Sequence, residues 1–227
     1  MNRRRFLTTC AAAIVAQPAV AGTGGLFAGG TGPLINLQSG QSLYERNAIE
    51  AADAEPDPGP MQFEASAPRH IELSTGVPVL TMWNVHTQEV LTIQPAVATG
   101  VDMSALAQAD RFMRDWRRNE VKSIDPNAIL GMLQIQQAAR QQGFSGQVRF
   151  LSGYRSRATN DALRAAGGGA ARNSLHIEAR AIDFSLPGVG MRDTIRLAKG
   201  LRIGGVGGYP SFVHIDTGRE RYWGSAV

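Results

Sequence analysis

The chain has 227 residues, of which 43% are hydrophobic and 19% are charged, and its formal net charge is +4 at pH 7. Three of the positive charges are the arginines at positions 3–5, so the rest of the chain is close to balanced. The sequence has no basic stripe interleaved with aromatic residues, which argues against a nucleic-acid partner. The length allows one or two domains.

Residues 1–21 have the pattern of an export signal. The arginines are followed by Phe-Leu, by a short apolar run and by the small-x-small triplet Ala19-Val20-Ala21. The NRRRFLT stretch favours a twin-arginine signal over a plain Sec signal, and it predicts a periplasmic protein. The apolar run is too short to cross a bilayer, so we expect no stable membrane span. The one cysteine, Cys10, lies in this segment, so the mature chain would contain no disulfide.

Residues 22–68 predict a flexible linker, because their glycine-rich start and the DAEPDPGP stretch bury little apolar area. The folded domain is expected at residues 69–227. It opens with two strand-like segments, HIELSTG and VPVLTMWNV, followed by a turn at 86–89 and a returning strand, VLTIQ. His70 and His86 lack a histidine or carboxylate at ligand spacing, so we expect neither to bind a metal.

Two amphipathic helices are expected next. Apolar residues recur at three- and four-residue steps over Met103–Arg118, and Trp116 is expected to anchor this helix in the core. Asp125 has the position of an N-cap for a second helix. Pro126 has the position of its first residue, and the helix should end near Gln142.

The second half of the domain alternates short strands with helices. We expect strands at 147–152, 181–186 and 212–217, and helices at 159–165 and 192–200. Thr159 and Asn160 are the expected capping residues of the first of these helices. The GGVGG stretch at 204–208 lacks the Lys-Ser/Thr ending of a phosphate loop, so we interpret it as backbone that passes close to a cleft. This order of elements predicts an α+β domain with a small antiparallel sheet and flanking helices.

Two histidines and two aspartates stand at short spacings in this half. His176 precedes Asp183 by seven positions, and His214 precedes Asp216 by two. Because strand side chains alternate between faces, His214 and Asp216 should share one face, and Asp183 should point away from its apolar neighbours. Two imidazoles and a nearby carboxylate form a ligand set that zinc accepts while keeping a fourth position open.

The same residues also have an interpretation without a metal. Asp183 could form a buried ion pair with Arg155 or with Arg180. That arrangement would leave His176 and His214 unexplained, so the metal interpretation is favoured.

Five segments carry a resemblance to a known family: SGYRS, N-x-x-L, S-x-H-x-x-x-x-A-I-D, GGVG-x-Y and FVHIDTG-x-x-R-x-W. They resemble the periplasmic murein endopeptidases of the zinc DD-peptidase superfamily. This superfamily also contains D-alanyl-D-alanine carboxypeptidases, D-Ala-D-Ala dipeptidases and the Hedgehog signalling domain. The resemblance covers roughly residues 70–227 and implies a Hedgehog/DD-peptidase-like fold.

The resemblance implies that His176, Asp183 and His214 are zinc ligands, with a water at the fourth position. Zinc lowers the pKa of such a water and polarises the scissile carbonyl. Arg155 matches the arginine that follows Gly-Tyr in the family, and its fixed charge suits a substrate carboxylate or the oxyanion that develops during attack. Ser174 would form a hydrogen bond to substrate in the same cleft.

The general base departs from the pattern of many carboxypeptidase members. They place a glutamate three positions before the last histidine, where this chain has Ser211. Asp216 is the candidate base because it shares a face with His214, and the alternative is that it orients a ligand imidazole. Glu178 is a third candidate.

The resemblance therefore implies a zinc-dependent murein endopeptidase that cuts peptide cross-links of peptidoglycan. Its partners would be anionic stem peptides, which an arginine at the cleft could receive. The alternatives are a carboxypeptidase that trims terminal D-alanine, and a zinc-stabilised wall-binding module without catalysis.

Overall fold

The computed structural model describes residues 55–58, 78–97 and 100–226. The predicted export signal, most of the predicted linker and His70 lie outside these residues, so the expected domain boundaries stay predictions. The predicted hairpin is present: β1 (Leu80–Asn84) pairs antiparallel with β2 (Val90–Ile93), and the predicted turn joins them.

The other strands are β3 (Ala96–Val97), β4 (Gly100–Val101), β5 (Val148–Ser152), β6 (Ala181–Ser185), β7 (Gly205–Gly208), β8 (Val213–Asp216) and β9 (Arg221–Trp223). Strands β3 and β4 form a small separate pair. The main sheet has seven strands in the order β2-β1-β5-β6-β8-β7-β9. Its β1–β5 and β7–β9 pairs are parallel and its other pairs are antiparallel. The sheet is therefore larger than predicted, and it is mixed rather than antiparallel.

Four helices are described: α2 (Met103–Phe112), α3 (Pro126–Gln141), α4 (Arg157–Ala165) and α5 (Met191–Leu201). Asp125 caps α3 as predicted, because its carboxylate accepts the backbone N–H of Asn127. The cap of α4 was predicted wrongly. Ser156 caps this helix, and its hydroxyl accepts the backbone N–H of Thr159.

The first predicted helix is shorter than its apolar stripe suggests, because α2 ends at Phe112. The chain then turns to bury Asp115, whose carboxylate accepts the backbone N–H groups of Arg117 and Ser156. Trp116 consequently leaves the core. It is partly exposed and stacks on His86 with 4.7 Å between the ring centroids.

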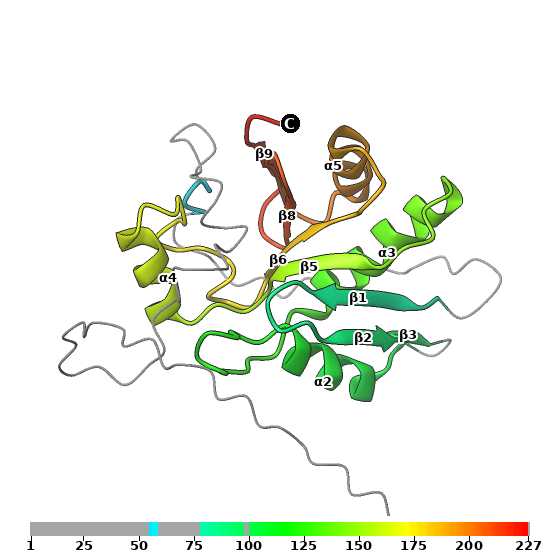
Figure 1. Cartoon of the computed structure of the whole chain (residues 1–227), viewed down its shortest axis with the longest axis horizontal. Coiled ribbons are helices and arrows are strands. Elements are labelled where there is room, and N and C mark those ends of the chain that lie inside the picture. Colours follow the sequence, from blue (N-terminus) through cyan, green and yellow to red (C-terminus); the bar gives the residue numbers. More distant parts are fainter. Residues whose placement is uncertain (1–54, 59–77, 98–99, 227) are drawn as a thin grey trace, which may run out of the picture. The chain divides into compact units, whose positions relative to one another are not determined.

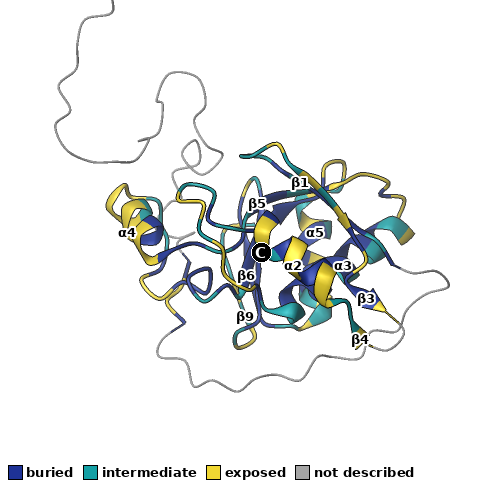
Figure 2. Cartoon of the chain, turned by 90° about the horizontal axis from the view of Figure 1, so that it is seen from below, coloured by how far each residue is buried: buried dark blue, intermediate teal, exposed yellow. Residues whose placement is uncertain are grey.

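Helices α2, α3 and α5 cover one face of the main sheet (Figure 1). Helix α3 contacts both of the others, so the three form one layer. The core lies between this layer and the sheet, and it receives Ile182 and Phe184 from β6 and Val213 and Ile215 from β8. Because side chains alternate along a strand, the intervening residues point to the opposite face. Figure 2 shows the buried strands and the largely exposed outer surface of α4.

Within the described part of the chain, no helix combines the length and the apolar character that crossing a membrane requires.

Candidate metal centre

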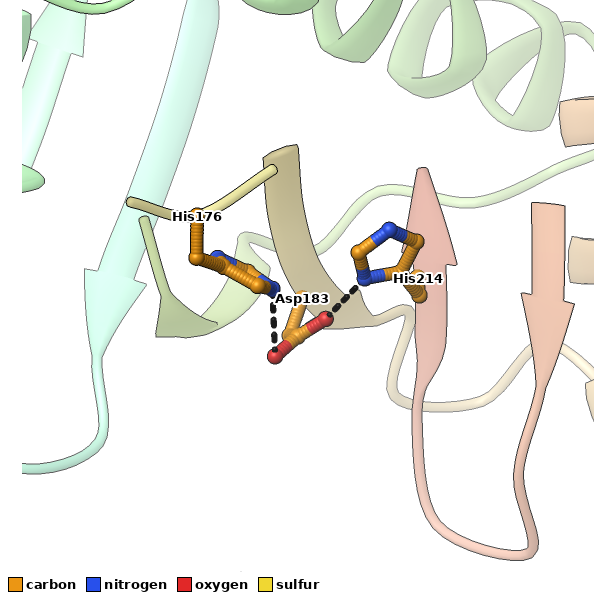
Figure 3. A group of neighbouring side chains, drawn as sticks. All are labelled: His176, Asp183 and His214. Atoms are coloured by element: carbon orange, nitrogen blue, oxygen red, sulfur yellow. Dashed lines mark hydrogen bonds and ion pairs between the residues drawn. The ribbon is translucent and has the colours of Figure 1, made fainter. Parts of the chain in front are cut away.

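Two neighbouring strands and one loop bring His176, Asp183 and His214 together (Figure 3). Asp183 on β6 lies directly opposite His214 on β8 in the register of the antiparallel pair. His176 comes from the loop before β6, where consecutive turns run from Ser174 to Ala179. Ala179 adopts a left-handed backbone conformation with φ of 58°, which redirects the chain into β6.

The spacing of these three side chains fits a metal ion. Asp183 Oδ2 lies 3.2 Å from His176 Nε2, and Asp183 Oδ1 lies 2.9 Å from His214 Nδ1. Zinc ligands at about 2.0–2.1 Å in a tetrahedron lie about 3.3 Å from one another. One ligand atom from each residue lies within 4.8 Å of the others, and all three residues are at most 2% exposed.

The outer nitrogen of each imidazole is held by a hydrogen-bond acceptor. His176 Nδ1 lies 2.7 Å from the carbonyl oxygen of Gly153, and His214 Nε2 lies 3.2 Å from Asp216 Oδ2. Metal-bound histidines donate their second ring N–H in this way to a carbonyl or a carboxylate. His176 Nε2 is buried, and its contact in the described structure is the one with Asp183 Oδ2. The donors therefore fit a metal that takes His176 Nε2 and His214 Nδ1.

The electrostatics of the cluster favour positive charge at its centre. Burial by itself raises the pKa of Asp183, but the charges and hydrogen bonds of the two histidines outweigh it and hold this pKa below its usual range. Burial lowers the pKa of His214. Hydrogen bonds to Asp183 and Asp216 outweigh that effect and raise the pKa from 6.5 to about 10. The carboxylates that raise the pKa of His214 would also stabilise a divalent cation.

Asp216 is engaged on both of its carboxylate oxygens. Its Oδ1 accepts the backbone N–H groups of Gly205 and Gly218 at 3.0 and 2.8 Å. Its Oδ2 lies 2.9 Å from the Arg221 guanidinium as well as 3.2 Å from His214 Nε2. Burial raises the pKa of Asp216, but these contacts outweigh it and lower the pKa below its usual range. This arrangement favours the alternative in which Asp216 orients His214.

Arg155 lies beside Asp183 and is 2% exposed. Its guanidinium donates to Asn160 Oδ1 at 3.2 Å and lies 3.7 Å from Asp183 Oδ2. Arg180, the other cation considered for Asp183, contacts Thr217 and Asp125 instead. Asp183 thus contacts Arg155 and both histidines at the same time. An ion pair between Asp183 and Arg155 would therefore also account for the burial of the two histidines beside it.

Of the other residues considered in the sequence analysis, one lies beside the cluster and two lie away from it. Ser174 is buried beside the cluster, and its hydroxyl donates to Glu55 Oε1 at 2.9 Å. Glu178 is partly exposed and lies 3.7 Å from Lys122, so the structure does not bring it to the cluster. His86 also lies apart, against Trp116.

An aromatic wall beside His214 was not predicted. The Tyr209 ring stacks on Phe212, and the Trp223 indole N–H donates to the Tyr209 hydroxyl at 2.8 Å. The Trp223 ring centroid lies 5.1 Å from that of His214. A Cβ atom on Gly207 would come within 2.7 Å of the Trp223 ring, so this glycine is needed for the close approach. Strand β7 (Gly205–Gly208) takes up most of the GGVGG stretch, and Gly207 lets the Trp223 ring pack against its backbone.

Glu55 and Arg221 are the other residues that the sequence analysis gave no role. Arg221 and Trp223 are the last two defined residues of the FVHIDTG-x-x-R-x-W segment, so that segment could have marked both as candidate site residues. Glu55 lies in the predicted linker, and no motif marks it.

The sequence is similar to those of known proteins. The sequence model of a family described as peptidoglycan L,D-endopeptidase MepK matches residues 72–223. The peptidoglycan L,D-endopeptidase MepK of Escherichia coli K12 is 40% identical over 162 residues, which cover 69% of this chain and 86% of the relative. The Shigella flexneri protein of the same name gives the same values. The probable peptidoglycan L,D-endopeptidase MepK of Haemophilus influenzae is 38% identical over 147 residues, covering 64% and 78%. No solved structure gives a significant match.

The family match runs from before β1 to the end of β9 and includes every residue of the His176–Asp183–His214 cluster. The chain therefore belongs to the Peptidase_M15_2 family, described as peptidoglycan L,D-endopeptidase MepK.

Proposed function

We propose that this protein is a zinc-dependent murein endopeptidase that hydrolyses peptide cross-links of peptidoglycan. It is a peptidase that cleaves peptidoglycan, because the family and its relatives are named peptidoglycan L,D-endopeptidases. Those names also support the finer proposal that the bond it cuts joins an L-centre to a D-centre. The observation that carries the mechanism is the buried cluster of two imidazoles and one carboxylate.

His176 Nε2, Asp183 and His214 Nδ1 would hold the metal. Two nitrogens and one carboxylate oxygen form a donor set that suits zinc and leaves a coordination position open for catalysis. When bound, zinc would lower the pKa of a water molecule and polarise the scissile carbonyl. Gly153 and Asp216 would keep the two imidazoles in the tautomers that direct the correct nitrogen inward.

Arg155 and Asp216 then have different tasks. Arg155 provides a fixed, buried positive charge beside Asp183, where it can stabilise the oxyanion that forms on the scissile carbonyl. Asp216 acts as a positioning residue, because Arg221 and two backbone N–H groups leave it poorly suited to accept a proton. Ser174 would bind a polar group of the stem peptide. Export to the periplasm by the twin-arginine route would bring the folded enzyme to this substrate.

Metal removal and product analysis test this function. Purified mature protein should convert cross-linked muropeptide dimers to monomers, a chelator should abolish the reaction, and added zinc should restore it. Liquid chromatography of the muropeptides reads out the result. Release of free D-alanine from monomers would instead identify a carboxypeptidase. Binding to sacculi with an unchanged muropeptide profile would identify a wall-binding module.

Asp216→Asn tests the assignment of Asp216 as a positioning residue. We expect zinc affinity to fall by about 10–100-fold, the usual effect of losing a partner of a ligand histidine, with most of kcat retained at saturating zinc. A metal-competition titration measures the affinity, and thermal unfolding checks that the variant is folded. If Asp216 is the general base, kcat at saturating zinc should fall by about 10²–10⁴-fold with zinc affinity unchanged. Glu178→Gln, on the partly exposed surface, is the matched control and should change neither quantity.

A further inference from the structure

A short acidic segment from the predicted linker lies against the loop that carries His176. The segment is Glu55–Pro58, with the sequence Glu-Pro-Asp-Pro (cyan in Figure 1). The backbone N–H of Glu55 donates to the carbonyl of Gly169 at 3.2 Å. Asn173 Nδ2 lies 3.1 Å from both carboxylate oxygens of Asp57. With the Ser174–Glu55 hydrogen bond, three contacts attach this segment to residues 169–174.

The segment directs one carboxylate inward. Glu55 is 9% exposed and Pro58 is buried, whereas Pro56 and Asp57 between them are exposed. A carboxylate loses hydration when it is buried, so it occupies such a position only where hydrogen bonds replace the lost water. Ser174, which is fully buried, supplies one of them.

The Glu55 carboxylate lies close to the candidate metal ligand His176 through its contact with Ser174. Ser174 stands two positions before His176, and its Oγ also lies 3.4 Å from the backbone N–H of His176. On the other side, the charge of Glu55 reaches the aromatic wall. Burial raises the pKa of the Tyr209 phenol, and the nearby Asp183 and Glu55 carboxylates add to that rise. Glu55 therefore contacts the loop that carries His176 through Ser174, and its charge acts on the Tyr209 phenol.

The chemistry of the segment matches that of the proposed substrate. Each proline fixes its own φ and favours an extended conformation in the residue before it, so Glu-Pro-Asp-Pro is held as an extended chain. It presents two carboxylates along this chain, as an anionic stem peptide would. The family match begins at residue 72, so the segment lies outside the part of the chain that the family model covers.

We propose that Glu55–Pro58 is an intramolecular inhibitor, in which the Glu55 carboxylate takes the place of a substrate carboxylate on Ser174. This inference rests on the proposed function, since it takes the competing ligand to be a stem peptide. Substrate would bind only to the fraction of molecules in which the segment has left the cleft, which raises the apparent Kd and KM without changing kcat.

Glu55→Gln in the mature full-length chain tests the proposal, because it keeps the size of the side chain and removes its charge. We expect the Kd for an uncross-linked stem tripeptide to fall by about five- to tenfold, with KM falling in parallel and kcat unchanged. Calorimetry on the zinc-loaded protein gives Kd. Hydrogen exchange at residues 169–176 should rise as the segment detaches. Glu220→Gln, an exposed glutamate near the C-terminus, is the matched control and should change none of these quantities.

Three results would overturn the proposal. An unchanged Kd and unchanged exchange in both Glu55→Gln and Glu55→Ala would show that the segment does not compete. A loss of kcat at constant Kd would place Glu55 in the chemical step. Absence of tripeptide binding in every variant would remove the competing ligand. Failure of the proposed function is separable: if no variant hydrolyses cross-links but Kd still falls in Glu55→Gln, the endopeptidase fails and the inhibitory segment stands.

Discussion

Asp183→Asn should lower kcat/KM by about 10³-fold or more, because the activated water and the polarised carbonyl both depend on a bound metal. Asparagine has the shape of aspartate but cannot supply an anionic ligand oxygen, and its NH₂ group would face one of the two imidazoles. Asp183 Oδ1 and Oδ2 contact His214 and His176 respectively, so no orientation of the amide can satisfy both. Elemental analysis after dialysis should find little bound zinc in the variant.

Asp193→Asn provides the matched control for this experiment. Asp193 lies on α5 and forms an exposed pair with Arg196, so its loss should leave both zinc content and turnover unchanged. If Asp183→Asn kept stoichiometric zinc and full turnover, Asp183 would not be a ligand. Its part in the cluster would then be that of an ion-pair partner of Arg155 and the two histidines.

The sequence could predict that the residues of the cluster lie close together, because their placement depends on local rules. Alternation along a strand puts His214 and Asp216 on one face, and the antiparallel register of β6 and β8 then sets Asp183 opposite His214. The apolar residues between them enter the core, as alternation requires. His176 was expected from the loop before Asp183, and the family resemblance supplied the role of all three residues as ligands.

The parts of the fold that were predicted wrongly depend on contacts distant in sequence. The parallel pairing of β1 with β5 joins strands separated by two helices, and no local pattern reports it. The apolar stripe of α2 continues past Phe112, but the burial of Asp115 against Ser156 ends the helix there. Glu55 was missed for the same reason, since its partner Ser174 is 119 residues away. Composition alone assigns such a segment to a linker.

The contacts of Asp216 bear on the choice of general base, because this chain has Ser211 where many carboxypeptidases have a glutamate. Sequence alone left open whether Asp216 serves as a base or orients an imidazole, because both tasks need a carboxylate on the same face. The contacts of Arg221, Gly205 and Gly218 separate the two, since a carboxylate that accepts these hydrogen bonds has its charge already stabilised. The base therefore has to be sought among groups that substrate or water can reach.

Arg155→Lys should lower kcat by about 100-fold while KM changes by less than about threefold. Asn160 and Asp183 fix the guanidinium, and the proposed function requires it to be preorganised for the charge that develops on the scissile carbonyl. Lysine keeps a positive charge beside Asp183, and so avoids leaving a buried carboxylate uncompensated. It presents that charge from a shorter, flexible stem without the guanidinium fork. Steady-state kinetics on cross-linked muropeptides at saturating zinc gives the two constants separately.

The distribution of the loss between the two constants identifies what Arg155 contacts. A rise in KM at constant kcat would place the guanidinium on a substrate carboxylate rather than on the oxyanion. Weaker zinc binding with normal kcat at saturating zinc would mean that Arg155 acts only through Asp183. Arg149→Lys makes the same exchange on β5, where the guanidinium lies over the Trp83 ring, and it should leave kcat, KM and zinc affinity unchanged. A fall in kcat specific to position 155 therefore requires a charge aimed at the reacting carbonyl.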